Sequence, residues 1–361
     1  MAKTLVIITG SFRSGGFERR LMQLLDWIKN NHLDFDVHVF YQSNKGFNKP
    51  LLPEGNMHYW PSHLFKSFIF TKWENYFFYK YLRYLFNKKK VNLFIGHQSI
   101  LNRIANNRYI INDNKIDIIA NIVNNLEYSP YKSEIFSSLK KCNSIICNSY
   151  DNQKILSEKM KIKNLFFIPN YYKIETKKYV DYDLTKKSIN IVSCGSFDKQ
   201  KNFKTLLRAV KAIKFQEKNI HFTIYGDGQQ KNEFIHYLEE ENINNVSFVN
   251  GKDFKKYVWQ YDIFIMTSIF EGYPNALLEA QISGLPSIAF DIDYGPREII
   301  DHKFSGILID ELNVKDLVIG INDVIKDLNQ YKVNTSKHSK KLLMKHSEKM
   351  TVLKMYEILK V

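Results

Sequence analysis

The segment FEGYPNALLE, residues 270–279, places two carboxylates, Glu271 and Glu279, eight positions apart beside an apolar run. Pro274 fits the first turn of a helix, where its missing N–H costs nothing, so Glu271 is expected in a loop and Glu279 in the second turn. A rise of about 1.5 Å per residue separates Pro274 from Glu279 by roughly 7–8 Å. Carboxylates at this spacing do not share one metal ion or one proton. Each can accept hydrogen bonds from hydroxyl groups, at two separate parts of one extended ligand.

Two other segments suit an anion. Lys201 stands just before a predicted helix that begins near Asn202, and Gly15 and Gly16 lie where a loop turns into a helix, so backbone N–H groups can approach a phosphate. A ligand with two hydroxyl-bearing ends and a diphosphate between them is a sugar nucleotide. Taken alone, a glycine pair serves a tight turn equally well, and a lone lysine is more often a solvated surface residue.

The elements that must position these residues are short apolar strands alternating with amphipathic helices. Such alternation favours parallel sheets covered on both faces, and 361 residues favour two domains, so we expect two doubly wound α/β domains. Ligands of such sheets collect at the carboxyl ends of the strands. The expected strands are TLVIIT, DVHVFY, VNLFIG, IDIIANI, NSIICN and NLFFIP in the first half, and INIVSCG, IHFTIYG, NVSFVNG, DIFIMT and PSIAF in the second.

The domain boundaries follow from polarity. Residues 1–170 form the first expected domain, the polar and weakly periodic residues 171–188 a linker, and residues 189–335 the second domain. The helical segment 336–361 is expected to dock back onto the first domain.

The formal net charge of +15 is concentrated in one half of the chain. Residues 1–180 hold 27 Lys and Arg against 13 Asp and Glu, whereas residues 181–361 hold 25 against 24. The first half therefore favours an anionic partner, such as a phosphate-bearing substrate, a lipid headgroup surface or nucleic acid. The sequence has no apolar run long enough to span a membrane and no signal-peptide pattern at its amino terminus. Three cysteines without metal spacing suit a reducing cytoplasm.

Residues 63–90 hold eleven aromatic residues and seven Lys or Arg against a single acid, Glu74. Trp and Tyr beside snorkelling Lys and Arg are typical of an interfacial membrane helix, and the alternative is a core helix with a basic outer face. We expect Trp73, Phe77, Lys88, Lys89 and Lys90 to contact an anionic membrane surface or a lipid-linked acceptor. Single-stranded nucleic acid also favours such residues, but no nucleic-acid module accompanies them, so no nucleic acid is expected. The apolar and aromatic residues that recur at helical spacing are Phe65, Ile69, Trp73, Phe77, Tyr81 and Tyr84.

Several motifs in order resemble one family. EGYPNALLEA resembles the E-x7-E signature of family 4 retaining glycosyltransferases, which have the GT-B fold of two Rossmann-like domains facing across a cleft. E-x7-E alone is permissive, but the resemblance covers most of the chain. Its other segments are GGFERR, the glycine loop; IPN, before the linker; CGSFDKQKN, the phosphate segment; YGDG, a glycine turn; and YGPREIIDHKFSGILI, after the donor loop.

The resemblance implies a role for each matching residue. Glu271 and Lys201 would be catalytic, with Glu271 binding donor-sugar hydroxyls and Lys201 the diphosphate, and Glu279 would bind the ribose diol. The remaining donor-binding residues would be Gly272, Tyr273, Pro274 and Asn275, whose backbone amides face sugar and phosphate, with Gly15, Gly16, Ser196 and Arg297. The bland alternative makes Glu279 an exposed helix residue and Glu271 a cap.

The chain departs from the family pattern at two positions. Ser196 stands where the family usually has Arg, so Arg297, Lys199 or Arg13 would have to substitute, or donor binding would be weaker. Where the family often has a histidine near the donor sugar, this chain offers Asn124 or Asn121. Asparagine can bond a sugar hydroxyl but cannot act as a base near neutral pH.

The resemblance predicts a retaining, metal-independent hexosyltransferase with no cofactor. It would move a hexose or N-acetylhexosamine from a UDP-linked donor to a lipid-linked or polysaccharide acceptor in bacterial surface-glycan biosynthesis, such as capsule or lipopolysaccharide. Its expected location is the inner face of the cytoplasmic membrane, as a peripheral protein. The alternative is a non-catalytic GT-B partner with a degenerate site.

Overall fold

The computed structural model describes residues 3–9, 16–31, 35–41, 56–59, 71–87, 89–96, 98–122, 126, 132–160, 164–172, 188–213, 219–310 and 312–360. These form two compact units, the first from Met1–Tyr171 with Glu348–Val361 and the second from Tyr172–Ser347. Gly15, Arg13, Asn124 and Lys88 lie outside the described residues, as does the side chain of Trp73.

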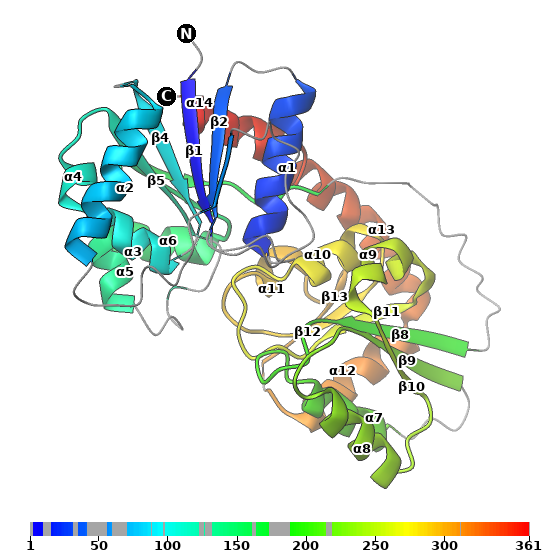
Figure 1. The fold of residues 1–361 in the computed structure, drawn as a ribbon. Helices are drawn as coiled ribbons and strands as arrows, with labels where there is room; N and C mark the ends of the chain where they lie inside the picture. Colours follow the sequence, from blue (N-terminus) through cyan, green and yellow to red (C-terminus); the bar gives the residue numbers. More distant parts are fainter. Residues whose placement is uncertain are drawn as a thin grey trace. The chain divides into compact units, whose positions relative to one another are not determined.

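The first unit is built on a parallel sheet of seven strands in the order β3-β2-β1-β4-β5-β6-β7 (Figure 1). Alternate residues of each strand face opposite sides: Leu5 and Ile7 pack toward α1 and α14, and Val6 and Ile8 pack in the core that includes α2 and α3. The strands are β1 Lys3–Thr9, β2 Phe35–Tyr41, β3 Met57–Tyr59, β4 Val91–Ile95, β5 Ile116–Ile122, β6 Ser144–Cys147 and β7 Leu165–Phe167. The helices are α1 Gly16–Asn30, α2 Thr71–Leu85, α3 Gln98–Ala105, α4 Arg108–Ile111, α5 Lys132–Leu139, α6 Tyr150–Lys159 and, after the π-helical turn Lys349–Leu353, α14 Lys354–Lys360.

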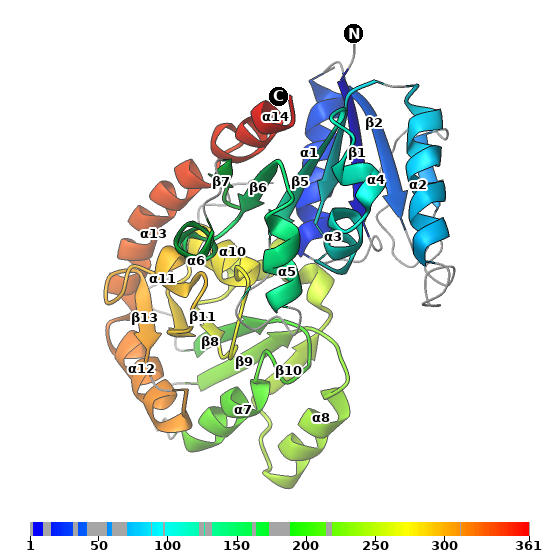
Figure 2. The same cartoon turned by 90° about the vertical axis from the view of Figure 1, so that its left-hand side faces the viewer.

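The second unit has a parallel sheet of six strands in the order β10-β9-β8-β11-β12-β13. Helices α7, α8 and α12 cover one face of this sheet, and α10 and α13 cover the other (Figures 1 and 2). The strands are β8 Ser188–Cys194, β9 Asn219–Tyr225, β10 Val246–Val249, β11 Ile263–Met266, β12 Ser287–Phe290 and β13 Gly306–Ile309. The helices are α7 Phe203–Ala212, α8 Lys231–Glu240, α9 Phe254–Tyr257, α10 Asn275–Ile282, α11 Pro296–Ile299, α12 Val314–Lys326 and α13 Leu328–Lys345.

The doubly wound α/β fold expected from the sequence is confirmed, and each expected strand is present. The edge strands β3 and β13 were not expected. Helix α10 begins at Asn275, one residue later than predicted, because Pro274 has an extended ψ of 89° and caps the helix instead of opening it. The chain leaves the second unit after Ser347, so α13 belongs to that unit, whereas the sequence had placed this change at residue 336.

The aromatic helix α2 presents two faces. Phe78, Leu82 and Phe86 are buried in the first core, whereas Phe77 is 58% and Tyr84 is 81% exposed. The alternative of a core helix therefore holds for one face of α2. The residues that the sequence analysis found at helical spacing face solvent at Phe77 and Tyr84. No helix within the described part of the chain is long and apolar enough to cross a membrane.

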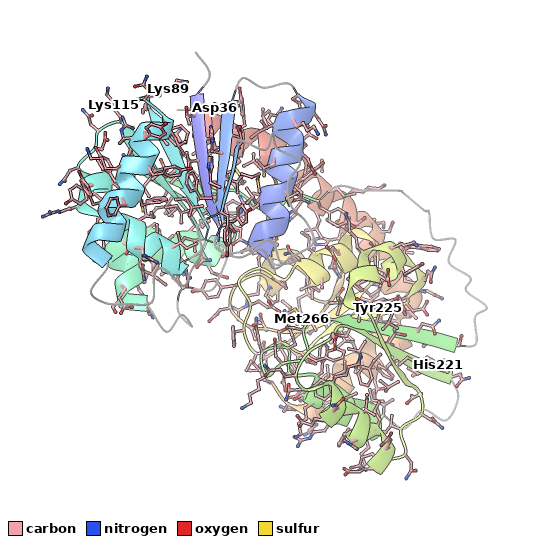
Figure 3. All side chains as sticks on the ribbon, viewed as in Figure 1. Asp36, Lys89, Lys115, His221, Tyr225 and Met266 are labelled. Carbon is pink, nitrogen blue, oxygen red and sulfur yellow. The ribbon has the colours of Figure 1, made fainter. Side chains whose placement is uncertain are left out.

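The basic residues after α2 lie at the amino ends of the strands. Lys89 and Lys90 directly precede β4 and are exposed, and Lys90 Nζ pairs with Asp117 at 2.9 Å. Figure 3 shows Lys89 at the same end of the first sheet as Asp36 and Lys115, which lie at the starts of β2 and β5. This end is opposite to the edge where open sheets bind ligands. These lysines can therefore face a surface, but they do not line the ligand-binding edge.

Candidate functional site

The second sheet has its topological switch point between β8 and β11. From β8 the chain proceeds outward to β9 and β10, then returns to add β11 on the other side of β8. The loops after β8 and β11 consequently leave in opposite directions and open a crevice, which is where ligands bind in such sheets. Figure 3 shows Tyr225 and Met266, at the carboxyl ends of β9 and β11, at one end of this sheet and His221 toward the other.

Lys201 and Glu271 meet at this switch point. Lys201 Nζ lies 2.5 Å from Glu271 Oε1, and the same oxygen accepts a hydrogen bond of 2.7 Å from Ser268 Oγ. Glu271 is only 6% exposed, and the Lys201 side chain is 21% exposed. A carboxylate this deeply buried requires such partners, because an unpaired charge is costly away from water.

The two loops that carry this pair are hydrogen-bonded to each other. Gln200 Nε2 donates to Phe270 O at 3.0 Å, Ile269 N donates to Gln200 O at 2.9 Å, and Thr267 Oγ1 donates to Lys201 O at 3.0 Å. These bonds fix the backbone on both sides of Lys201 and Glu271. The pair is therefore held by its loops as well as by its own contact.

Gly195 provides the space for the lysine side chain. A Cβ at this position would lie 2.9 Å from Lys201 Cγ, and a Cβ at Gly226 would lie 1.9 Å from the Gly195 carbonyl oxygen. Gly226 therefore requires glycine, and a side chain at Gly195 would displace the Lys201 side chain. The glycines of the CGSFDKQKN and YGDG segments thus bring the backbone close to the site.

Ser196 and Arg297, the described residues considered for the missing arginine, each bond to a carboxylate other than Glu271. Ser196 is exposed, and its Oγ donates to Asp198 Oδ2 at 2.5 Å. Arg297, which follows β12, is 65% exposed and pairs with Asp291 at 2.7 Å. Arg297 therefore remains accessible to a ligand, with its Nε bound to a carboxylate.

Helix α10 presents its amino terminus beside the site. Asn275 is its first residue, Glu279 is its fifth, and Glu279 is only 6% exposed, so the alternative of an exposed helix residue is wrong. Gly295, with a φ of 114°, packs on the residue before the helix, because a Cβ there would lie 2.3 Å from Pro274 Cδ. The start of α10 is therefore fixed by the loop after β12.

Sequence reasoning missed the contact that supports Tyr273. The Tyr273 hydroxyl lies 3.1 Å from His346 Nε2, and both side chains are buried. The His346 carbonyl accepts from Tyr172 N at 3.1 Å, so His346 also joins the two points where the chain enters and leaves the second unit. No local pattern could reveal a contact between residues 73 positions apart. For Ser268 and Thr267 a signal existed, because both hydroxyls follow directly after β11.

Few of the site residues expected in the first unit are described. Gly16 is the first residue of α1, while Gly15 and Asn124 lie outside the described part. Asn121 is buried in β5, one residue before the strand ends.

Comparison with known proteins gives a family match for the second unit. Residues 174–341 match the model described as "Glycosyl transferases group 1". A poly(ribitol-phosphate) alpha-N-acetylglucosaminyltransferase of Staphylococcus aureus is 26% identical over 200 residues, which span 54% of this chain and 40% of that protein. An uncharacterized glycosyltransferase of Methanocaldococcus jannaschii is 28% identical, over 54% of this chain and 52% of its own length. The chain thus spans about half, or less, of these relatives.

Other relatives are matched over more of their length. The amylovoran biosynthesis glycosyltransferase AmsD of Erwinia amylovora is 23% identical over 90% of both chains. Among solved structures, Anabaena Alr3699/HepE in complex with UDP has a TM-score of 0.77 at 16% identity, over 99% of both chains. The lipopolysaccharide outer core galactosyltransferase WaaB has a TM-score of 0.71 at 19% identity, over 95% of this chain and 99% of that one. The chain therefore has the fold of GT-B glycosyltransferases, and its residues 174–341 carry the match to glycosyl transferases group 1, which together support a glycosyltransferase.

Proposed function

We propose that the protein is a retaining, metal-independent glycosyltransferase of family 4 that moves a hexose or N-acetylhexosamine from a UDP-sugar. The observation that carries the proposal is the Lys201–Glu271 pair, held at the switch point of the second sheet at a distance of 2.5 Å. A cation and a carboxylate fixed side by side at this place suit a ligand that has a diphosphate next to a sugar.

The pair retains bonding capacity for such a ligand. Among the described residues both hydrogen bonds to Glu271 fall on Oε1, which leaves Oε2 for a sugar hydroxyl. An ammonium group has three donors, and Glu271 occupies one of those of Lys201, so others can serve diphosphate oxygens. Glu271 would thus orient the sugar while Lys201 stabilises the charge that develops on the leaving diphosphate.

Helix α10 would hold the nucleotide. The positive end of the helix dipole, near Asn275, favours phosphate, and the buried carboxylate of Glu279 in its second turn suits the ribose diol. Gly272 leaves the loop backbone open to close approach.

The proposed reaction occurs on one face of the sugar. The acceptor hydroxyl oxygen forms a bond to C1 of the sugar on the face from which the diphosphate oxygen departs, and that diphosphate accepts the hydroxyl proton. No protein base is required, in keeping with asparagines in the place of the family's histidine. The name of the S. aureus relative specifies an alpha linkage, which supports retention if the donor is an α-linked nucleotide sugar.

A lipid-linked or polysaccharide acceptor is supported by the names of relatives. A Campylobacter jejuni relative, 26% identical over 61% of both chains, is named as acting on a diphospho-undecaprenol-linked saccharide. AmsD is named for amylovoran biosynthesis. The exposed Phe77 and Tyr84 of α2 favour peripheral attachment to a membrane, the surface on which such acceptors reside. The second candidate, a non-catalytic GT-B partner, is motivated by Ser196 in the phosphate segment.

The experiment is a thermal-shift screen of UDP- and GDP-sugars, followed by transfer of radiolabelled sugar to membrane extracts. We expect UDP-sugars to raise the melting temperature, and one of them to be turned over. Binding of UDP-sugars without transfer or donor hydrolysis would favour the non-catalytic partner. No binding of any nucleotide would contradict both candidates.

A further inference from the structure

Ser268 is a buried serine whose hydroxyl contacts the carboxylate of the proposed site. It lies two residues after β11 and is 1% exposed, and its Oγ donates to Glu271 Oε1 at 2.7 Å. Lys201 Nζ lies 2.5 Å from the same oxygen. One oxygen of Glu271 is therefore held twice, once by a cation and once by a neutral hydroxyl.

The bond from the cation has a competitor in the proposed reaction. A diphosphate carries more negative charge than a single carboxylate, so it attracts the ammonium group of Lys201 away from Glu271. The lysine side chain is 21% exposed and has a flexible four-carbon stem, which allows this movement. We expect the contact between Lys201 and Glu271 to weaken once a nucleotide sugar is bound.

The bond from Ser268 has no such competitor, because a side chain buried this deeply is out of reach of a ligand. The two residues between Ser268 and Glu271 are fixed as well. Ile269 N donates to Gln200 O at 2.9 Å, and Phe270 O accepts from Gln200 Nε2 at 3.0 Å. The fold therefore sets the position of the Ser268 hydroxyl, with or without a ligand.

The bond from Ser268 determines which way the carboxylate of Glu271 turns. The terminal torsion of a glutamate side chain is broad, so a carboxylate without a fixed partner takes a range of orientations. With Oε1 held, Oε2 has a defined direction, and the Glu271 side chain keeps 8% exposure. Oε2 is thus the oxygen that remains for a sugar hydroxyl.

We propose that Ser268 is a positioning residue for the donor sugar. It holds Glu271 Oε1 while Lys201 engages the diphosphate, so that Oε2 keeps its orientation toward a sugar hydroxyl. Ser268 acts through Glu271 and touches neither the sugar nor the diphosphate. The inference rests on the proposed glycosyltransferase function and deepens it, because it assigns the two bonds to Glu271 to different stages of ligand binding.

The first test separates the sugar from the nucleotide. Ser268→Ala removes only the hydroxyl, and titration calorimetry measures the affinities for UDP and for the UDP-sugar that raises the melting temperature most in the screen. We expect the affinity for UDP to stay the same, because Lys201 and Glu279 are retained. The affinity for the UDP-sugar should fall about three- to tenfold, the equivalent of roughly one hydrogen bond.

The matched control is Ser193→Ala in β8 of the same sheet. Ser193 is 3% exposed, and its Oγ donates to Ile265 O at 2.6 Å, so the same atom is lost from a similarly buried place without contact to Glu271. Both variants should lose a few degrees in melting temperature. Only Ser268→Ala should change the ratio of the two affinities.

Turnover at saturating UDP-sugar should also fall about three- to tenfold in Ser268→Ala and stay unchanged in Ser193→Ala. A melting temperature that falls while the ratio of affinities stays at the wild-type value would show a purely structural hydroxyl and overturn the proposal. Equal losses for UDP and the UDP-sugar would overturn it too, because the effect would then lie at the nucleotide. In both cases the glycosyltransferase function stands, whereas a wild-type protein that binds no UDP-sugar would overturn that function together with the role of Ser268.

Discussion

At the scale of single residues, two polar side chains of the second unit bond to the same carboxylate. Glu271 accepts hydrogen bonds from both Lys201 and Ser268, so its carboxylate is buried and already oriented before any ligand arrives. Such preorganisation favours catalysis because the site does not have to rearrange when charge develops. Glu279 is equally buried but lies on a helix, at the other end of the expected ligand.

The different positions of Glu271 and Glu279 predict that their substitution affects two different properties. Glu279→Ala should weaken UDP binding measured by calorimetry, because a lost charge-assisted hydrogen bond costs about 1.5–3 kcal/mol. Glu271→Ala should leave UDP binding nearly intact and lower the turnover of the UDP-sugar by a comparable free energy. Glu233→Ala, an exposed residue paired with Lys204, serves as the control and should change neither. Equal UDP affinity in wild type and Glu279→Ala would remove the ribose assignment.

The sequence predicts candidate site residues, but it does not indicate what they contact in the fold. Glu271 and Lys201 were identified from spacing and resemblance, yet each was assigned to a different part of the ligand, and their mutual contact was not anticipated. The two are 70 positions apart, and their meeting depends on β11 returning beside β8, a topological fact that no local pattern contains. The same holds for Tyr273 and His346.

At the scale of elements, α13 is joined by polar contacts to the loops around the site. Lys332 pairs with Asp262 at 2.6 Å before β11, and Lys345 lies 3.4 Å from Glu298 in α11. His346, at the end of the helix, lies within hydrogen-bond distance of Tyr273 in the loop before α10. The helix thus transmits its position to the loops that carry the proposed site.

We therefore expect Tyr273 and His346 to act as a coupled pair of positioning residues. Tyr273→Phe and His346→Leu should each lower kcat by about three- to tenfold, and the double variant should lose little more than one of them, because both remove the same bond. Tyr261→Phe is the matched control. It also removes a tyrosine hydroxyl, but that hydroxyl lies 3.0 Å from the hydroxyl of Tyr225 and not in the loop before α10. Additive losses in the double variant would contradict the coupling.

The aromatic residues of helix α2 fit the helical period in more than one way, so the sequence alone does not show which of them are buried. With eleven aromatic residues in residues 63–90, more than one stripe fits the helical period, and the stripe that packs is Phe78, Leu82 and Phe86. The stripe through Phe77 and Tyr84 was left for the surface. Strand β3 was missed for a related reason, because three half-exposed residues have too short a pattern to recognise.

The exposed side chains of Phe77 and Tyr84 predict membrane attachment that persists at high salt concentration. Phe77→Ser with Tyr84→Ser should reduce co-sedimentation with phosphatidylglycerol vesicles at high salt, where charge is screened but apolar burial persists. Lys89→Gln with Lys90→Gln should reduce it only at low salt, by about 1 kcal/mol per unpaired lysine and less for Lys90, which pairs with Asp117. Ile319→Ser, at a comparably exposed apolar residue of α12, is the control. Unchanged sedimentation of both α2 variants would rule out attachment through this helix.

At the scale of the whole molecule, the two units differ in the number of chain segments that form them. The second is continuous from Tyr172 to Ser347, whereas the first requires Glu348–Val361 in addition to Met1–Tyr171. Val352, Met355 and Leu359 are buried in the core that α1 covers, and Trp27 Nε1 donates to Glu348 Oε1 at 2.7 Å.

This arrangement predicts that the second unit is autonomous. A fragment of residues 172–347 should fold cooperatively and bind UDP with an affinity close to that of the full chain, because Lys201, Glu271 and Glu279 all lie within it. A chain that ends at residue 347 should show one normal melting transition and a second at lower temperature, since the first core then loses three buried apolar side chains. Scanning calorimetry measures both. A fragment that is unfolded in isolation would contradict the prediction.

The bond between Asn92 Nδ2 and Leu359 O joins residues 267 positions apart and bears on how the protein is made. A ribosome that adds about 5–20 residues per second needs roughly 13–50 s to synthesise that interval. During this time the nascent first sheet keeps part of its α1 face uncovered, while the second unit can already close its own core. The second core can therefore be complete before the first, although the first unit is translated earlier. The α1 face of the first sheet waits longest for its partner, and it is the part that a chaperone would bind.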